Sequence, residues 1–210
     1  IVETRCRYIT DPKYGGPEYE TCASFGSLCM NDDLGVIAKA NELCNRYSID
    51  TIATGVSIAF AMECYEKGIL KKKDTNGIDL SWGNGDAIIG MIQKIARREG
   101  IGDVLAEGVR KAAEKIGGGS EAWALTVKGA ELPMHEPRGK KGMGLGYATS
   151  DRGASHLQVY HDDSFENEAN VAPEIGIDST LVPQGRTETG PRKAKLAKIC
   201  EDLKGLYNSL

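Results

Sequence analysis

The sequence has few aromatic residues, little net charge and no long hydrophobic run. Aromatic residues make up 6% of the 210 residues, which argues against a protein that stacks nucleic-acid bases on aromatic rings. A formal net charge of −4 gives no electrostatic reason to bind nucleic acid or an anionic membrane. The longest apolar stretch, "TGVSIAFAM", is interrupted by Gly55 and Ser57 and is far shorter than the roughly 20 residues of a membrane span. We therefore expect no nucleic-acid partner and no membrane partner.

The chain also lacks the features that direct a protein to an oxidising compartment. It opens "IVETRCRYIT", without a basic start or a long apolar segment, so we predict no signal peptide and a cytoplasmic location. In such a protein six cysteines do not indicate a disulfide framework, and none of their spacings gives C-x-x-C. We expect Cys44, Cys64 and Cys200 to be buried as small hydrophobic residues.

One short stretch, "GPEYETCASFGSLC" at residues 16–29, gathers several reactive side chains. It places the carboxylates of Glu18 and Glu20 beside the thiols of Cys22 and Cys29. From the residues alone, three interpretations are open: a C-x6-C metal pair, a catalytic acid, or a turn followed by a small core.

Helical periodicity dominates the rest of the chain, and strand alternation is nearly absent. The segments with apolar residues at helical spacing are 31–48, 50–68, 85–100, 103–119 and 192–210. The segment 50–68 is apolar nearly all round, which predicts a helix buried in a larger body. Residues 122–133 could form a short strand or an irregular segment. We therefore predict an all-α, multihelical fold.

Residues 134–156, "MHEPRGKKGMGLGYATSDRGASH", depart from this pattern. The segment holds five glycines, four basic residues and two of the three histidines of the protein. It could be a mobile surface connection. It could also be a segment whose backbone approaches an anionic ligand, because glycines permit close approach and basic residues suit anions. Histidine is also the usual side chain for proton transfer near neutral pH.

Three segments in order resemble the aldehyde ferredoxin oxidoreductase family of tungsten enzymes. They are "GPEYET" (16–21), "NELCNRYSIDTIATGVSIAFAMECYEKGIL" (41–70) and the text from "GIGDVLAEGVRKAAEKIG" to "MHEPRGKKGMGLGYATSDRGASHL" (100–157). The resemblance implies the helical portion of that family, in which a pterin-holding sheet domain precedes two helical domains. We expect that sheet domain to be absent, with residues 1–133 and 134–210 as parts of the two helical domains.

The resemblance also implies roles for three side chains. Glu20 matches the glutamate that lies near the tungsten, where it would position or deprotonate water. His156, in "SHL", resembles an active-site histidine that hydrogen-bonds an oxygen near the metal. His135 resembles a substrate-binding position that is tyrosine in some members. We expect Glu20 and His156 to share one concave face.

The cofactor positions of the family match only in part. The segment "NRYSID" resembles a D-x-x-G-L-D pattern that hydrogen-bonds the pterin, with Asp50 conforming and Asn45 in place of the first Asp. Cys6 could correspond to the last cysteine of a C-x-x-C-x-x-x-C run, but Val2 stands where an earlier cysteine would be. Because a [4Fe-4S] cluster needs four thiolates, we expect no cluster, no cofactor and no activity on this piece alone.

For the complete protein, the resemblance implies oxidation of an aldehyde to a carboxylate. A tungsten (or molybdenum) bis-pterin would take two electrons, and a [4Fe-4S] cluster would pass them to ferredoxin. The implied partners are ferredoxin and a small aldehyde, with a homodimer as one option. Two alternatives are a related tungstopterin reductase of the aromatic acyl-CoA type and a non-catalytic helical module.

Overall fold

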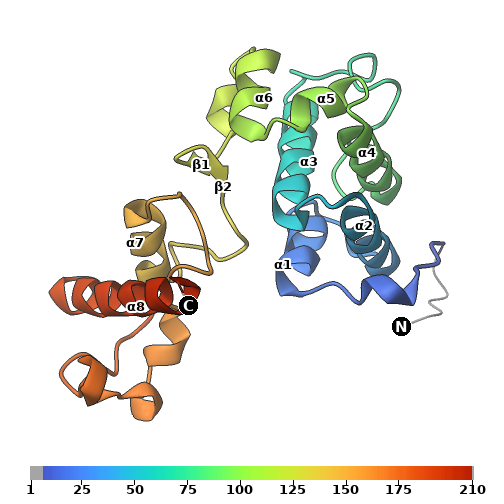
Figure 1. Cartoon of the computed structure of the whole chain (residues 1–210). Helices are drawn as coiled ribbons and strands as arrows, with labels where there is room; N and C mark the ends of the chain where they lie inside the picture. The colour runs from blue at the N-terminus through green and yellow to red at the C-terminus, as the bar shows by residue number, and fades with distance from the viewer. Residues whose placement is uncertain (1–6, 210) are drawn as a thin grey trace. The chain divides into compact units, whose positions relative to one another are not determined.

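The chain folds into two compact units, residues 1–126 and 127–210. The computed structural model describes residues 7–209. Helices dominate both units, which confirms the predicted all-α, multihelical fold (Figure 1). Within the described residues, the only paired strands are β1 (Thr126–Val127) and β2 (Ala130–Glu131), inside the segment predicted to contain a short strand. That the units belong to two helical domains of a larger enzyme stays a prediction.

The helices of the first unit begin where the sequence places capping residues. Its elements are η1 (Pro12–Tyr14), α1 (Tyr19–Cys22), η2 (Ala23–Ser27, a π-helical turn), α2 (Leu34–Tyr47), α3 (Thr51–Glu66), α4 (Gly85–Arg97), α5 (Ile101–Leu105), α6 (Val109–Ile116) and η3 (Ser120–Trp123). Asp33 caps α2 by accepting from the backbone N–H groups of Gly35 and Val36. Asp50 caps α3 in the same way. Each cap satisfies a backbone donor that has no partner inside the helix.

The buried helix predicted at residues 50–68 is α3, which forms the middle of the core of the first unit. It lies beside α2 and α4 (Figure 1). Ile58 and Met62 on α3 are fully buried, as are Ile88 and Ile92 on α4. Cys44 and Cys64 are buried in the same core, which confirms their predicted packing as small hydrophobic residues.

Two predicted helix boundaries in the first unit are wrong. The helix predicted at 85–100 ends at Arg97, because Arg98 adopts a left-handed backbone conformation (φ 54°, ψ 49°) two residues before Gly100. The helix predicted at 103–119 is two helices, α5 and α6, separated at Gly108 (φ 83°, ψ 160°). Apolar periodicity continues across the break, so the sequence pattern does not reveal it.

The second unit contains a helix that the sequence analysis missed. Its elements after β2 are α7 (Lys141–Thr149), the short 3-10 helices η4 (Asp162–Phe165), η5 (Glu168–Asn170) and η6 (Pro173–Ile175), and α8 (Pro191–Ser209). Helix α7 occupies the glycine-rich segment for which a mobile connection was one interpretation. Met143 and Tyr147 on α7 are buried against Val159, so this part of the segment is ordered core.

The glycines of α7 permit close packing against side chains of their own unit. A Cβ at Gly146 would lie 1.9 Å from Cγ1 of Val159. A Cβ at Gly142 would lie 2.2 Å from the hydroxyl oxygen of Tyr160. Both distances are far below van der Waals contact, so any larger residue would push α7 away. At these two positions glycine serves helix packing.

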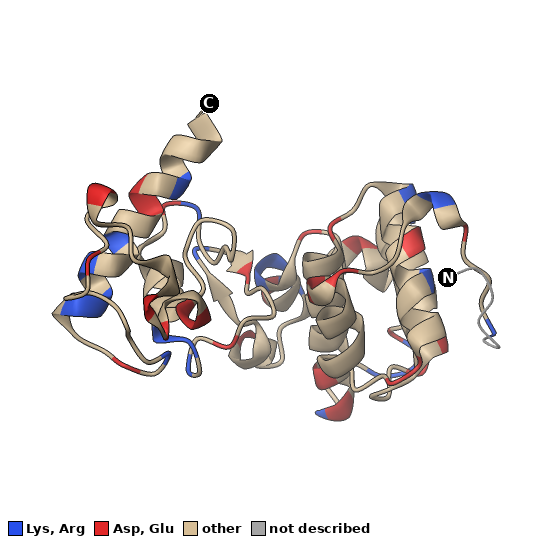
Figure 2. Ribbon diagram, turned by 90° about the horizontal axis from the view of Figure 1, so that it is seen from below, with Lys and Arg blue, Asp and Glu red and all other residues tan. Residues whose placement is uncertain are grey.

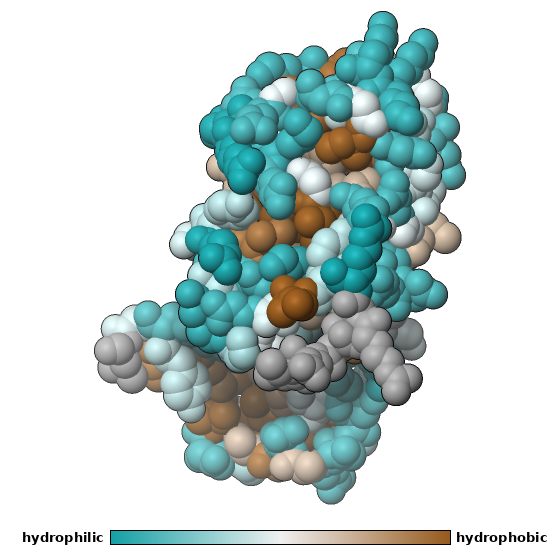
Figure 3. Space-filling model, turned by 90° about the vertical axis from the view of Figure 1, so that its right-hand side faces the viewer, coloured by the Kyte–Doolittle hydropathy of each residue, from teal (hydrophilic) through white to brown (hydrophobic). Residues whose placement is uncertain are grey.

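The surfaces of the two units carry both signs of charge. Basic and acidic residues are interspersed on each unit (Figure 2). The face shown in Figure 3 is mainly hydrophilic, with hydrophobic residues in small patches. Within residues 7–209, no helix is both long enough and apolar enough to cross a lipid bilayer.

Candidate active site

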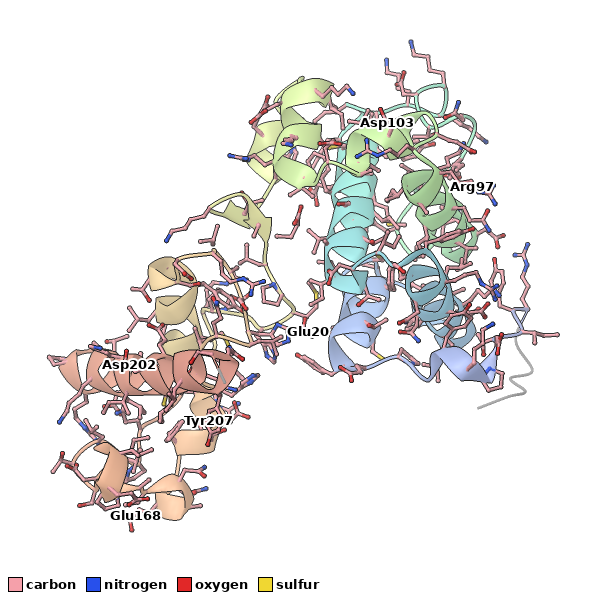
Figure 4. The ribbon with its side chains drawn as sticks, in the orientation of Figure 1. Glu20, Arg97, Asp103, Glu168, Asp202 and Tyr207 are labelled. Atoms are coloured by element: carbon pink, nitrogen blue, oxygen red, sulfur yellow. The ribbon has the colours of Figure 1, made fainter. Side chains whose placement is uncertain are left out.

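Glu20 lies in the first turn of α1, immediately before the π-helical turn η2. Figure 4 shows this labelled side chain on α1. The residue is half-buried, and its carboxylate oxygen Oε1 is buried. π-Helical turns inside helices are frequent at functional sites, because the extra residue re-aims neighbouring side chains.

The segment that carries Glu20 is fixed to the start of α3. The hydroxyl of Thr21 donates to that of Thr51 over 2.8 Å. The hydroxyl of Ser24 is 3.2 Å from the carbonyl oxygen of Thr51. These contacts are buried or partly buried, so they hold α1 and η2 in one orientation. A catalytic carboxylate requires this kind of rigid support.

The thiols next to Glu20 pack in the core of the first unit. Cys29 is fully buried, and its Sγ lies 3.3 Å from the carbonyl oxygen of Ser24. Burial raises the pKa of Cys29 to about 12, so without a metal its thiol stays protonated at neutral pH. Cys22 packs against the same core. The carboxylate of Glu20 therefore stays the candidate reactive group of the stretch at residues 16–29.

The two predicted pterin-binding residues lie on either side of the turn between α2 and α3, Asn45 in the last turn of α2 and Asp50 at the N-cap of α3. Asn45 is exposed, and its amide nitrogen donates to the carbonyl oxygen of Asn41 over 2.9 Å. Asp50 is exposed, and Oδ1 accepts from the backbone N–H of Ala53 over 2.7 Å. The second oxygen of Asp50 and the amide oxygen of Asn45 accept no hydrogen bond from residues 7–209. Two oxygen acceptors of this kind fit the N–H groups of a pterin ring.

Three histidines meet in the second unit: His135, His156 and His161. The ring centroids of His135 and His156 are 5.5 Å apart. Those of His135 and His161 are 4.5 Å apart, with the rings nearly perpendicular. Sequence motifs indicated His135 and His156 but not His161. The sequence contains only three histidines. This scarcity is the one feature of the sequence that could have drawn attention to His161.

Burial and positive neighbours lower the pKa of two of these imidazoles, His135 and His161. The pKa of His135 is lowered from 6.5 to about 4, first by burial and then by repulsion from His161, Lys140 and His156. The pKa of His161 is lowered as well, again first by burial and then by Lys140. Asp163 opposes both effects, but its carboxylate accepts a 2.7 Å hydrogen bond from Lys140. A neutral imidazole at position 135 can donate a hydrogen bond to a carbonyl oxygen without bringing charge.

Acid should destabilise the protein partly through His135. In the unfolded chain this residue binds a proton near pH 6.5, whereas in the folded protein it does so only near pH 4. Between these values the unfolded state holds more protons, so stability falls as the pH falls. We expect His135→Gln to reduce the loss of Tm between pH 7 and about 4.5 by about 5 °C. Thermal unfolding followed by circular dichroism measures this, and equal pH slopes for the two proteins would contradict it.

No iron–sulfur site is found in the part of the chain that the structure describes. Residues 7–209 contain no group of three or more His, Cys, Asp or Glu side chains placed to hold a metal ion. Cys44, Cys64 and Cys200 are buried, and burial raises the pKa of each thiol above its usual value. Cys6, the weakly predicted ligand, lies outside the described residues. The described cysteines therefore do not fit a [4Fe-4S] cluster.

The fold and the histidine cluster define a class, a multihelical protein whose clustered imidazoles suit hydrogen bonding and proton transfer. A family model described as aldehyde ferredoxin oxidoreductase, domains 2 and 3, matches residues 3–210. The chain therefore belongs to the aldehyde ferredoxin oxidoreductase family, as its sequence motifs had indicated.

Several relatives carry names that describe their chemistry. The tungsten-containing aldehyde ferredoxin oxidoreductase of Pyrococcus furiosus is 39% identical over 196 residues, which cover 92% of this chain and 30% of that protein. The aliphatic sulfonate oxidoreductase, WOR-like subunit, of the same organism is 33% identical over 168 residues, covering 73% and 27%. The chain thus spans about 30% of the length of these relatives.

One solved structure has the same fold. It is the active-site complex BamBC of benzoyl coenzyme A reductase in complex with 1,5-dienoyl-CoA, with a TM-score of 0.68 and 24% sequence identity. The alignment covers 93% of this chain and 32% of the other. At this identity the likeness establishes the multihelical fold and nothing about substrate.

Proposed function

We propose that the complete protein to which this chain belongs is a tungsten-pterin oxidoreductase that oxidises aldehydes to carboxylic acids, with ferredoxin as electron acceptor. The observation that carries the proposal is the match to relatives named tungsten-containing aldehyde ferredoxin oxidoreductase over 92% of the chain. The reaction converts an aldehyde and water into a carboxylic acid, two protons and two electrons. When bound, the tungsten pterin would supply the two-electron chemistry.

In this proposal Glu20 handles the proton of water. A half-buried carboxylate on a rigid element can hold a water molecule and accept its proton as the oxygen attacks the aldehyde carbon. Asn45 and Asp50 would hold the pterin through the two oxygens that have no partner within residues 7–209. Since the described cysteines do not fit an iron–sulfur cluster, ferredoxin as acceptor is supported only by the names of the relatives.

His156 and His135 would act on the carbonyl oxygen. A neutral imidazole donates one hydrogen bond, which stabilises the negative charge that develops on this oxygen during attack. The low pKa of His135 suits this role, because the ring stays neutral across the physiological range. The three rings lie close together, so protonating one disfavours protonating the others.

Assays of the complete protein with a viologen dye test the proposal. We expect tungsten in the purified protein and dye reduction that depends on an aldehyde such as acetaldehyde or benzaldehyde. If no aldehyde is oxidised but an aromatic acyl-CoA thioester is reduced, the protein is a tungstopterin reductase instead. A well-folded complete protein without tungsten or molybdenum would contradict both enzyme assignments and leave the non-catalytic helical module.

A further inference from the structure

The second unit contains a pocket that none of the roles above uses. Its volume is about 540 Å³, within the range of sites for small organic ligands. One wall is α8, and the other runs from Val159 through η4, η5 and η6 to Ile177. All of these residues belong to the same compact unit.

The interior of this pocket is mainly apolar. Its apolar lining residues are Val159, Phe165, Ala169, Val171, Ala172, Ile175, Ile177 and Leu203. Burial raises the pKa of Cys200 to about 11 and also raises the pKa of Tyr160. Both groups are therefore uncharged at pH 7, and the pocket wall that they contribute carries no charge. The body of a suitable ligand is aliphatic or aromatic.

The charge on the pocket lining is positive. No aspartate or glutamate lines it, and Lys204 is its one charged lining residue among residues 7–209. Lys204 makes no hydrogen bond and no ion pair with any residue from 7 to 209, unlike Lys193 and Lys198 on the same helix. An ammonium group at the edge of an apolar pocket, without a carboxylate partner, favours a ligand with one anionic end.

The pocket adjoins the histidine cluster. His161 lines the pocket, and its ring contacts that of His135 at a centroid distance of 4.5 Å. A ligand in the pocket therefore lies against the ring next to the proposed substrate-binding histidine.

We propose that this pocket binds a carboxylate with an apolar aliphatic or aromatic body, with Lys204 as the counter-ion of the carboxylate group. A carboxylic acid of this kind is also the class of product that aldehyde oxidation releases. The link between this pocket and the reaction product rests on the proposed function. Binding of a carboxylate in the pocket does not depend on that function.

Isothermal titration calorimetry on the complete protein, with 3-phenylpropionate and its uncharged amide as probes, tests the assignment. We expect the carboxylate to bind more tightly than the amide. Lys204→Met should weaken carboxylate binding about tenfold and leave amide binding unchanged. Lys198→Met is the matched control, because Lys198 lies on the same helix but outside the pocket, paired with Asp202 over 2.7 Å. It should bind both probes as the unmodified protein does.

A second variant tests whether the probes occupy this pocket. Ala169 is exposed and lines it, so Ala169→Trp adds an indole ring without disturbing the core. We expect it to weaken binding of both probes at least about tenfold. Equal affinity for acid and amide, or full binding by Lys204→Met and Ala169→Trp, would overturn the assignment. If the protein binds the carboxylate but oxidises no aldehyde, the assignment of the pocket holds. In that case only the proposed function is contradicted.

Discussion

Replacing Glu20 by glutamine should lower kcat of the complete enzyme by about 100-fold or more, because the amide cannot accept the proton of water. Glutamine has nearly the same shape and keeps one oxygen acceptor, so the fold around α1 and η2 should persist. KM for the aldehyde should change little, since the carboxylate acts on water. Steady-state dye reduction with one aldehyde over a range of concentrations separates the two parameters.

Glu18→Gln is the matched control for this experiment. Glu18 is exposed at the start of α1, and its side chain makes no capping hydrogen bond. We expect its kcat to stay within about twofold of the unmodified enzyme, since surface changes of this kind have small effects. An unchanged kcat in Glu20→Gln would remove Glu20 from the chemistry. Equal losses in both variants would point to a general effect of charge near α1.

Replacing Asp162 by asparagine should destabilise the second unit by about 3–5 kcal/mol, because it leaves a buried ammonium group without its counter-ion. The side chains of Asp162 and Lys193 are 0% and 4% exposed, and their charged atoms lie 2.7 Å apart. The carboxylate also accepts from the backbone N–H groups of Gly142 and Met143 at the start of α7. One side chain thus connects η4, α7 and α8. Hydrogen exchange of the amides in α7 and α8 measures the loss.

Asp202→Asn is the control for burial of the ion pair. Asp202 pairs with Lys198 over the same 2.7 Å, but both side chains are largely exposed. Exposed pairs contribute about 0–1 kcal/mol, so this variant should exchange like the unmodified protein. Equal effects of the two substitutions would mean that burial does not set the strength of the Asp162–Lys193 pair. The double change Asp162→Leu with Lys193→Met should recover part of the loss, since it removes both buried charges.

Capping residues and apolar spacing in the sequence were enough to predict much of the first unit. A capping side chain followed by apolar residues at helical spacing located the starts of α2 and α3, and an all-round apolar pattern identified α3 as the buried helix. These signals lie within a few residues of one another, so they can be seen without tertiary structure. The break between α5 and α6 could not be predicted in this way, because apolar spacing persists across Gly108.

The second unit was harder to predict because its structure depends on contacts between residues that are far apart in the sequence. Glycine-rich sequence usually disfavours a helix, yet α7 forms where Gly142 and Gly146 pack against Tyr160 and Val159. His161 joins the cluster only because the chain returns to His135 after 26 residues (161 − 135). Resemblance to the family supplied Glu20, His156 and His135. The free ammonium of Lys204 and its pocket required the structure.

Anomalous X-ray scattering at the tungsten absorption edge, from crystals of the complete protein, tests the central claim most directly. We predict one tungsten peak near both Glu20 and His156. The pterin should contact Asn45 and Asp50. A tungsten peak remote from either Glu20 or His156 would contradict the assignment of the active site.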